Sequence, residues 1–335
     1  MTVKVAINGF GRIGRLALRS IVELHREDVE VVAINDLGPV ATLAHLLRYD
    51  SVHGPFRGSI DLGEDWIDVG SGKIRVSSEH DPANLPHDEL GVDVALECTG
   101  FFTSREKAES HIRAGAKRVL ISAPSDGADK TIVFKVNHDT LTADDVVVSN
   151  GSCTTNVLAP VAKVLNDLCG IERGYMTTVH AYTGDQPTQD TVHKDLYRAR
   201  AAALSMIPTS TGAANAIGRV LPELKGKLHG SSIRVPTPNV SVIDLAVSTS
   251  REVSINEVND AIRQTAAGAM SGVLAFTTEP LVSVDLNHRT ESSIVALPQT
   301  DVVDGRMVRV LAWYDNEWSF ATRMADTAVA MAKLI

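Results

Sequence analysis

The chain has 335 residues, of which 44% are hydrophobic and 22% charged, a balance typical of globular proteins rather than of disordered ones. Lys and Arg number 32 against 41 Asp and Glu, and the resulting net charge of −9 argues against a protein that grips nucleic acid or an anionic membrane through bulk charge. This length favours two domains, and the absence of an apolar leader or of a run long enough to span a bilayer predicts a cytoplasmic location and no membrane partner.

Residues 1–152 alternate short apolar runs with segments of helical periodicity, which is typical of βαβ units in a doubly wound, mostly parallel sheet. Strands are expected at 3–7, Val29–Ile34, Val92–Glu97, Arg118–Ser122 and Asp145–Ser149, and helices at 13–24 and Ser104–Ala114. We therefore predict a Rossmann-type domain over 1–152, with a C-terminal helix at 318–335 that packs back on it.

The pattern changes after residue 152. A helix is predicted to begin near Cys153, and residues 181–210 form a long polar loop. Strands are expected at Tyr175–His180, Ile233–Val235, Val240–Thr249, Leu281–Asp285 and Val308–Tyr314, with one helix at Ile255–Ala267. Because few crossover helices separate these strands, residues 153–317 are predicted to form an α+β catalytic domain with a mixed or antiparallel sheet.

A glycine-rich segment, Gly9-x-Gly11-x-x-Gly14, lies between the first strand and the first helix and includes Arg12 and Ile13. In this context the glycines allow a tight turn, a close approach of the backbone to a pyrophosphate, and close helix–strand packing. Asp36 ends the second strand, where a carboxylate binds the adenosine ribose and repels the 2′-phosphate of NADP. The segment predicts an NAD site, the alternative being a structural turn and a surface aspartate.

Cys153 stands at the expected start of a helix, where free backbone N–H groups stabilise a thiolate and lower the thiol pKa. His180 ends the next strand and could take the thiol proton. Cys98 and Cys169 are expected to be buried structural residues, and the cysteine and histidine spacing predicts no metal site.

A redox nucleotide and an activated cysteine together indicate oxidation of an aldehyde through a thioester on the cysteine. Several positive or hydroxyl-bearing residues downstream of Cys153 favour phosphate, rather than water, as the second nucleophile. These candidates for oxyanion binding are Thr183, Arg198, Arg234 and the 209–212 turn.

Eight motifs in order make the chain resemble phosphorylating glyceraldehyde-3-phosphate dehydrogenases over essentially its whole length. They are AINGFGRIG at 6–14, YDSVHG at 49–54, SCTTN at 152–156, HAYT at 180–183, ARAAA at 199–203, IPTSTGAA at 207–214, RVPTPNV at 234–240 and WYDNEW at 313–318.

The resemblance implies residue roles as well as a fold. Cys153 would be the nucleophile and His180 the base of an NAD-dependent oxidative phosphorylation of D-glyceraldehyde 3-phosphate to 1,3-bisphosphoglycerate. The substrate phosphate would be held by Thr183 and Arg234, inorganic phosphate by Ser152, Thr154, Thr211 and Gly212, with Arg198 between the two sites, and the nicotinamide by Asn316. The family's homotetramer implies a partner copy, against whose cofactor site the loop at about 181–205 packs.

The sequence departs from the family at four places. Val157 replaces a common second cysteine, and Lys135 and Ser319 replace usual glycines, which costs strain only where the backbone φ is positive. Thr191 and Val192 stand where strictly NAD-dependent relatives tend to carry Leu-Pro, so some use of NADP alongside NAD is compatible with the sequence.

Three other functions compete. An erythrose-4-phosphate dehydrogenase would share the cysteine and histidine but hydrolyse the thioester, and it usually departs from the HAYT and TSTG patterns found here. A non-catalytic NAD-binding protein should have lost Cys153, His180 or Arg234, and an acyl-phosphate reductase of amino-acid biosynthesis lacks this motif set.

Overall fold

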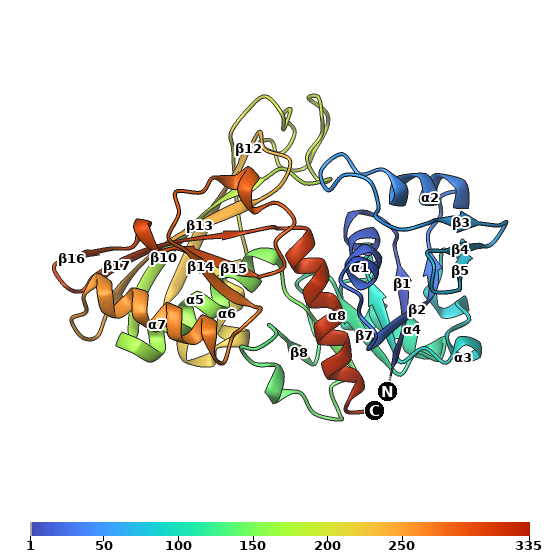
Figure 1. The fold of residues 1–335 in the computed structure, drawn as a ribbon, viewed down its shortest axis with the longest axis horizontal. Coiled ribbons are helices and arrows are strands. Elements are labelled where there is room, and N and C mark those ends of the chain that lie inside the picture. The colour runs from blue at the N-terminus through green and yellow to red at the C-terminus, as the bar shows by residue number, and fades with distance from the viewer. Residues whose placement is uncertain (1) are drawn as a thin grey trace. The chain divides into compact units, whose positions relative to one another are not determined.

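The computed structural model describes residues 2–335, which divide into two compact units (Figure 1). Unit 1 contains the described residues up to Ser152 together with Phe320–Ile335, and unit 2 contains Cys153–Ser319. No helix within the described residues has the length and apolar character needed to cross a membrane.

Unit 1 is built on a nine-stranded sheet in the order β3-β4-β5-β2-β1-β6-β7-β9-β8. The strands are β1 (Val3–Asn8), β2 (Val29–Asn35), β3 (Asp61–Leu62), β4 (Trp66–Asp68), β5 (Lys73–Ser77), β6 (Val94–Glu97), β7 (Arg118–Ile121), β8 (Lys130–Thr131) and β9 (Val147–Ser149). The pairs from β5 through β8 are parallel, and the β3–β4 and β4–β5 pairs are antiparallel. This arrangement confirms the predicted Rossmann-type sheet.

The crossovers of unit 1 carry its helices. They are α1 (Arg12–Glu23), α2 (Val40–Arg48), α3 (His87–Leu90) and α4 (Arg105–Arg113); the C-terminal α8 (Trp318–Ala332) instead follows the last strand of unit 2, and its residues from Phe320 onward belong to unit 1. Ser104 caps α4 by accepting a hydrogen bond from the Lys107 N–H. Every residue of β6, β7 and β9 is buried, which explains why these strands are continuous apolar runs rather than alternating ones.

Unit 2 holds an eight-stranded mixed sheet in the order β11-β12-β10-β13-β17-β15-β14, with β16 beside β17. The strands are β10 (Ile171–Ala181), β11 (Ile207–Thr209), β12 (Leu228–Val235), β13 (Ser241–Thr249), β14 (Leu274–Thr277), β15 (Ser293–Ala296), β16 (Asp301–Val303) and β17 (Met307–Tyr314). Helices α5 (Cys153–Cys169), α6 (Ala213–Val220) and α7 (Ile255–Ala267) lie together along one face of this sheet (Figure 1). The opposite face is only half-buried along β13, where every second side chain is partly exposed.

One predicted strand is wrong. The Leu281–Asp285 run alternates like a strand, but residues Ser283–Leu286 form a 3₁₀ helix. The Asp285 carboxylate accepts the N–H of Val282 at 2.9 Å, a local bond that closes the turn, and Val282 and Val284 are exposed. Leu281 nevertheless packs against the core cluster of Val240, Leu286 and Ile294, so this run contributes to the core of unit 2 without joining its sheet.

The two glycine replacements have different consequences. Lys135 has a φ of +61°, the left-handed conformation that favours glycine. Ser319 instead lies in the first turn of α8, where its hydroxyl donates to the Asp315 carbonyl at 2.7 Å. Only the Lys135 position carries the expected backbone strain.

Candidate active site and dinucleotide pocket

The pairing of strands in unit 2 places several polar side chains close together at one end of its inner strands. In the parallel β10–β12 pair His180 lies directly opposite Arg234, so both side chains project from the same face. In the antiparallel β13–β17 pair Ser241 lies opposite Tyr314 at the same end. Residues far apart in the sequence thus become neighbours where these strands end.

Cys153 is the first residue of α5, a helix that packs on β10, β13 and β17. Its sulfur lies 3.4 Å from His180 Nε2, within hydrogen-bonding range for a thiol and an imidazole. The side chain is half-buried. A cysteine paired with a histidine at a helix start is the arrangement expected of an activated nucleophile.

His180 is buried, and its two ring nitrogens face different groups: Nε2 faces the Cys153 sulfur, and Nδ1 faces Ala181 and Arg234. The Ala181 carbonyl lies 2.6 Å from Nδ1, and the Arg234 guanidinium contacts the same Nδ1 and donates to that carbonyl at 2.9 Å. Guanidinium only donates, so Arg234 pairs with Nδ1 when that nitrogen carries no proton; the alternative tautomer, with a proton on Nδ1 donated to the Ala181 carbonyl, leaves the Nε2 lone pair directed at the sulfur. This tautomer is the one that can accept a thiol proton.

The protonation states differ from the predicted thiolate. Burial raises the pKa of the Cys153 thiol, although Arg234, Thr154 and the backbone N–H groups at the start of α5 act to lower it. Burial also lowers the pKa of His180 to about 3, and the Arg234 cation acts in the same direction. The prediction of a lowered cysteine pKa is therefore wrong in its net direction, because burial outweighs the helix N-terminus. Both shifts favour the uncharged forms of the thiol and the imidazole.

Tyr314 links α5, which carries the nucleophile, to β10, which carries the base, and sequence analysis did not single it out. Its buried hydroxyl lies 3.0 Å from Thr154 Oγ1 and 2.9 Å from Thr178 Oγ1. Its ring meets His180 edge-on, with centroids 5.8 Å apart. The available signal was its position within the WYDNEW motif, which becomes informative only when the β13–β17 register is known.

Asn316 is held by a second residue that sequence reasoning missed. Ser241 donates its hydroxyl to Asn316 Oδ1 at 2.8 Å and accepts the Ala181 N–H at 3.0 Å. Because the amide oxygen is engaged, the orientation of the Asn316 side chain is fixed with its NH₂ group available as a donor.

The predicted phosphate-binding residues occupy different surroundings. Thr183 donates both its N–H, at 2.8 Å, and its hydroxyl, at 3.2 Å, to the Gln186 side-chain oxygen. Arg198 pairs with Asp185 at 2.6 Å and donates to Thr209 Oγ1 at 2.9 Å. Arg198 is thus engaged by a carboxylate.

The remaining candidates lie near helix starts. Thr211 accepts the Ala213 N–H at 3.2 Å, Gly212 precedes α6 as its N-cap residue, and Thr154 stands in the first turn of α5. Ser152 is half-buried and is the last residue of unit 1 before α5 begins.

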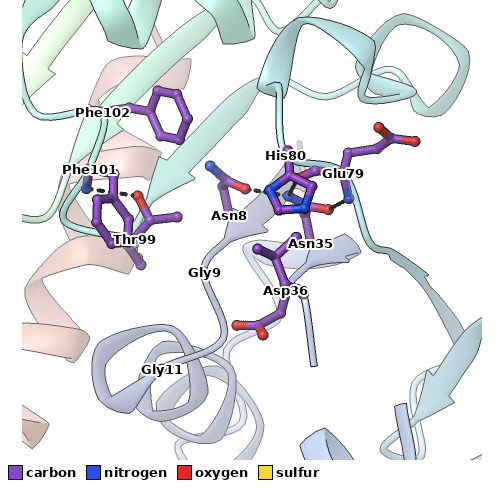
Figure 2. Close-up of a pocket in the computed structure, with 12 residues that line it drawn as sticks. Asn8, Gly9, Gly11, Asn35, Asp36, Glu79, His80, Thr99, Phe101 and Phe102 are labelled. Carbon is purple, nitrogen blue, oxygen red and sulfur yellow. Dashed lines mark hydrogen bonds between the residues drawn. The ribbon is translucent and has the colours of Figure 1, made fainter. Parts of the chain in front are cut away.

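A cavity of about 520 Å³ opens in unit 1 at the carboxyl ends of β1 and β2 (Figure 2). Its lining residues are Asn8, Gly9, Gly11, Asn35, Asp36, Leu37, Glu79, His80, Cys98, Thr99, Phe101 and Phe102. Cys98 is half-buried in this wall rather than enclosed in the core as expected.

The three glycines of the motif have distinct physical roles here. Gly9 has a φ of +89°, and a Cβ at Gly14 would lie 2.1 Å from the Gly9 carbonyl oxygen. A Cβ at Gly11 would meet nothing within 4 Å, so the backbone there borders open space. Helix α1 begins directly after Gly11 with no side-chain cap, which leaves its first N–H groups free of a capping side chain.

Asp36 lies at the rim of the pocket beside the glycine-rich loop (Figure 2). Its carboxylate accepts the Phe10 N–H at 2.8 Å and the Gly38 N–H at 3.0 Å. An uncapped helix start, a backbone with room beside it and a fixed carboxylate at the strand end are the features that suit a dinucleotide pyrophosphate and ribose. These residues therefore fit NAD.

The other two predicted cofactor residues are Arg12 and Ile13, both in the first turn of α1. The Arg12 guanidinium pairs with Asp50 at 2.5 Å. Burial would raise the pKa of Asp50, but the His53 and Val52 N–H groups and Arg12 lower it to about 2. Arg12 thus anchors the segment that follows α2.

Comparison with known proteins gives consistent results in both units. Residues 3–105 match the family model described as the glyceraldehyde 3-phosphate dehydrogenase NAD binding domain, and residues 152–316 match the model of its C-terminal domain. The chain is 67% identical to glyceraldehyde-3-phosphate dehydrogenases of Cereibacter sphaeroides and Xanthobacter flavus, over 100% of both chains in each case. It is 55% identical to that of Pseudomonas aeruginosa, over 99% of each chain.

Proposed function

Because the chain belongs to the glyceraldehyde-3-phosphate dehydrogenase family, we propose that its Cys153–His180 pair carries out NAD-dependent oxidative phosphorylation of D-glyceraldehyde 3-phosphate to 1,3-bisphosphoglycerate. The observation that supports these two residues is the 3.4 Å separation of Cys153 Sγ and His180 Nε2 at the start of α5. The reaction belongs to glycolysis and gluconeogenesis.

Cys153 acts as the nucleophile. His180 Nε2 accepts the thiol proton while the sulfur forms a bond to the aldehyde carbon, and the same proton then neutralises the alkoxide to give a hemithioacetal. His180 next accepts the hydroxyl proton as the carbon loses a hydride, which leaves a thioester on Cys153. NAD, when bound, supplies the acceptor for that hydride.

Arg234 has two effects on this chemistry. Its positive charge opposes protonation of the adjacent His180 ring, so the imidazole is neutral and able to accept a proton. As a ligand of the substrate phosphate, together with Thr183, it would share that charge with an anion and raise the basicity of His180 once substrate is bound. Substrate binding and base strength are coupled in this way.

The attacking phosphate is assigned to the hydroxyl and N–H groups of Ser152, Thr154, Thr211 and Gly212. Phosphate attack on the thioester carbon releases the Cys153 thiolate and forms the acyl phosphate. Arg198 would serve the anions between the two phosphate positions by exchanging its bond to Asp185 for one to phosphate.

Residues 1–152 with the helix at 318–335 are assigned as the NAD-binding domain, and 153–317 as the catalytic domain. Gly9, Gly11, Arg12, Ile13 and Gly14 would receive the pyrophosphate, Asp36 the ribose hydroxyls, and Asn316 the nicotinamide amide. The Asp36 carboxylate favours NAD over NADP.

We further propose that the protein is a cytoplasmic homotetramer. The loop between β10 and β11 exposes an unusual number of large apolar side chains, which a monomer would leave in water. They are Val192, Leu196, Tyr197, Leu204 and Met206, with exposures from 63% to 101%. A second copy of the chain is the proposed cover for this loop.

The test is NADH formation from glyceraldehyde 3-phosphate with and without inorganic phosphate, in parallel with erythrose 4-phosphate. Turnover that requires phosphate is the expected result, with erythrose 4-phosphate a poor substrate. Turnover independent of phosphate would mean that water takes the thioester, and the phosphate assignments would be wrong. Cys153→Ser is the matched control, since it should bind NAD but form no NADH.

A further inference from the structure

A buried carboxylate lies behind the dinucleotide pocket without lining it. Glu97 ends β6 and is 1% exposed. One oxygen, Oε1, accepts the Thr99 N–H at 2.7 Å and also the Thr99 hydroxyl. The other, Oε2, accepts the Asn8 side-chain N–H at 2.6 Å and lies 3.1 Å from His111 Nε2. Both oxygens of this carboxylate are therefore engaged in hydrogen bonds.

Through its hydrogen bond to Asn8, Glu97 is connected to two walls of the pocket. Asn8 stands at the end of β1, and its side-chain oxygen accepts an N–H of Asn35, at the end of β2, at 2.7 Å. Asn35 also donates to the Glu79 carbonyl at 2.9 Å and accepts the Glu79 N–H at 2.8 Å. Asn8, Asn35 and Glu79 all line the cavity, and Figure 2 shows this chain of bonds across it.

Through its hydrogen bonds to Thr99, Glu97 also holds the opposite wall of the pocket in place. Thr99 accepts the Phe101 N–H at 3.0 Å, which orders the segment that carries Phe101 and Phe102 beside the cavity (Figure 2). A Cβ at Gly9 would lie 2.7 Å from the Thr99 backbone nitrogen, so this segment is packed against the glycine-rich loop. A shift of Thr99 would therefore alter the loop on which the pyrophosphate is expected to rest.

Two imidazoles complete the arrangement on the side away from the pocket. His111 is fully buried in α4, and its Nδ1 lies 3.0 Å from Nε2 of His87, which is also buried. A carboxylate oxygen only accepts, so the contact between Glu97 and His111 Nε2 is a hydrogen bond donated by the imidazole. Within residues 2–335, His111 is the only titratable donor on this carboxylate.

We propose that Glu97, supported by His111, is a positioning residue for NAD binding: its two oxygens hold Asn8 and Thr99, and through them the walls of the dinucleotide pocket, in place. The proposal rests on NAD as the cofactor but is independent of what becomes of the thioester.

The experiment is calorimetric titration of NAD into the full-length protein without aldehyde or phosphate. Glu97→Gln keeps the size of the side chain but retains one acceptor oxygen, so its NH₂ group must face the donors of either Thr99 or Asn8. We expect the Kd for NAD to rise roughly tenfold, the loss of about one charge-assisted hydrogen bond. The KM for NAD should rise in parallel, while kcat at saturating NAD stays within about twofold of the native value.

Asp145→Asn is the matched control. Asp145 is also buried in unit 1, accepts the N–H and the hydroxyl of one threonine, Thr142, and does not line the pocket. An unchanged Kd in Glu97→Gln, or an equal rise in Asp145→Asn, would overturn the proposal.

A second pair of variants decides the question should Glu97→Gln fail to fold. His111→Leu removes the outer donor to Glu97, whereas His111→Gln places an N–H group near the same position. The leucine variant should bind NAD more weakly by several-fold and the glutamine variant should approach native affinity. Equal NAD affinities in the two variants would refute the role of Glu97. A protein that binds NAD as expected but hydrolyses the thioester would leave this inference intact and overturn only the proposed reaction.

Discussion

Replacing Tyr314 with phenylalanine is expected to weaken both the stability and the catalytic rate of the protein. The substitution removes one oxygen atom from the centre of unit 2 and keeps the ring that meets His180 edge-on. The oxygen is hydrogen-bonded to Thr154 on α5 and to Thr178 on β10, so its loss removes one hydrogen-bonded link between the helix of the nucleophile and the strand of the base.

The size of the effect follows from burial. Each of the two lost hydrogen bonds contributes about 1 kcal/mol net, and a buried hydroxyl left without a partner costs roughly 1 kcal/mol more. Thr178 is 1% exposed, so water does not replace the tyrosine oxygen there. We therefore expect the free energy of unfolding to fall by about 2–3 kcal/mol.

Urea titration followed by tryptophan fluorescence measures this change, and NADH formation measures kcat. The rate should fall several-fold because Thr154 adjoins Cys153 in the first turn of α5, while the Kd for NAD should stay the same. Tyr175→Phe on the same strand β10 is the control, since that side chain is 53% exposed and its change should be nearly neutral. A Tyr314→Phe protein with native stability and native kcat would refute the reasoning.

Three further outcomes are expected. Lys135→Gly should raise the free energy of unfolding by about 1 kcal/mol, since a φ of +61° is strained for lysine, and Lys135→Ala should not; equal urea midpoints for the two variants would contradict this. Asp36→Ala should raise the ratio of kcat/KM with NADP to that with NAD by at least about tenfold, because the carboxylate that repels a 2′-phosphate is gone; an unchanged ratio would place ribose recognition elsewhere. Alkylation of Cys153 by iodoacetamide speeds up with pH as the thiolate forms, and the burial-raised pKa of this thiol places that rise above the usual thiol range. Arg234→Leu removes a cation that lowers the cysteine pKa, so its profile should move to still higher pH, and a move to lower pH would contradict the assignment.

The features that sequence analysis predicted well are those encoded locally. The glycine motif, the strands on either side of it and a helix at Cys153 depend on residues within one or two turns of each other. The helix predicted over Ile255–Ala267 has the same bounds in the structure, where Ser254 and Glu257 form a complete capping box at its start. The alternating pattern of β13 likewise reports one buried and one half-exposed face.

The features that sequence analysis missed depend on neighbours distant in the chain. Strands of two or three residues such as β3 and β8 have no periodicity of their own and exist through pairing. Tyr314 acquires its role from Thr154, 160 positions earlier, and Glu97 from Asn8, 89 positions earlier. The sign of the cysteine pKa shift was also beyond reach, since it depends on how much protein surrounds the sulfur.

The pairing of His180 with Arg234 across β10 and β12 limits how this protein can change in length. Side chains alternate between the faces of a strand, so deleting one residue within β10 ahead of His180 would turn the imidazole to the opposite face and separate it from both Cys153 and Arg234. The length of the loop between β10 and β11 does not determine how β10 and β12 pair, because β12 is aligned with β10 by the hydrogen bonds between these two strands. Insertions and deletions among active descendants of this gene should therefore be absent from the interiors of β10 and β12, whereas in the loop they should be absent only around Thr183, Arg198 and the apolar side chains proposed to meet a second copy. A library of single-residue deletions selected for activity would show the same division.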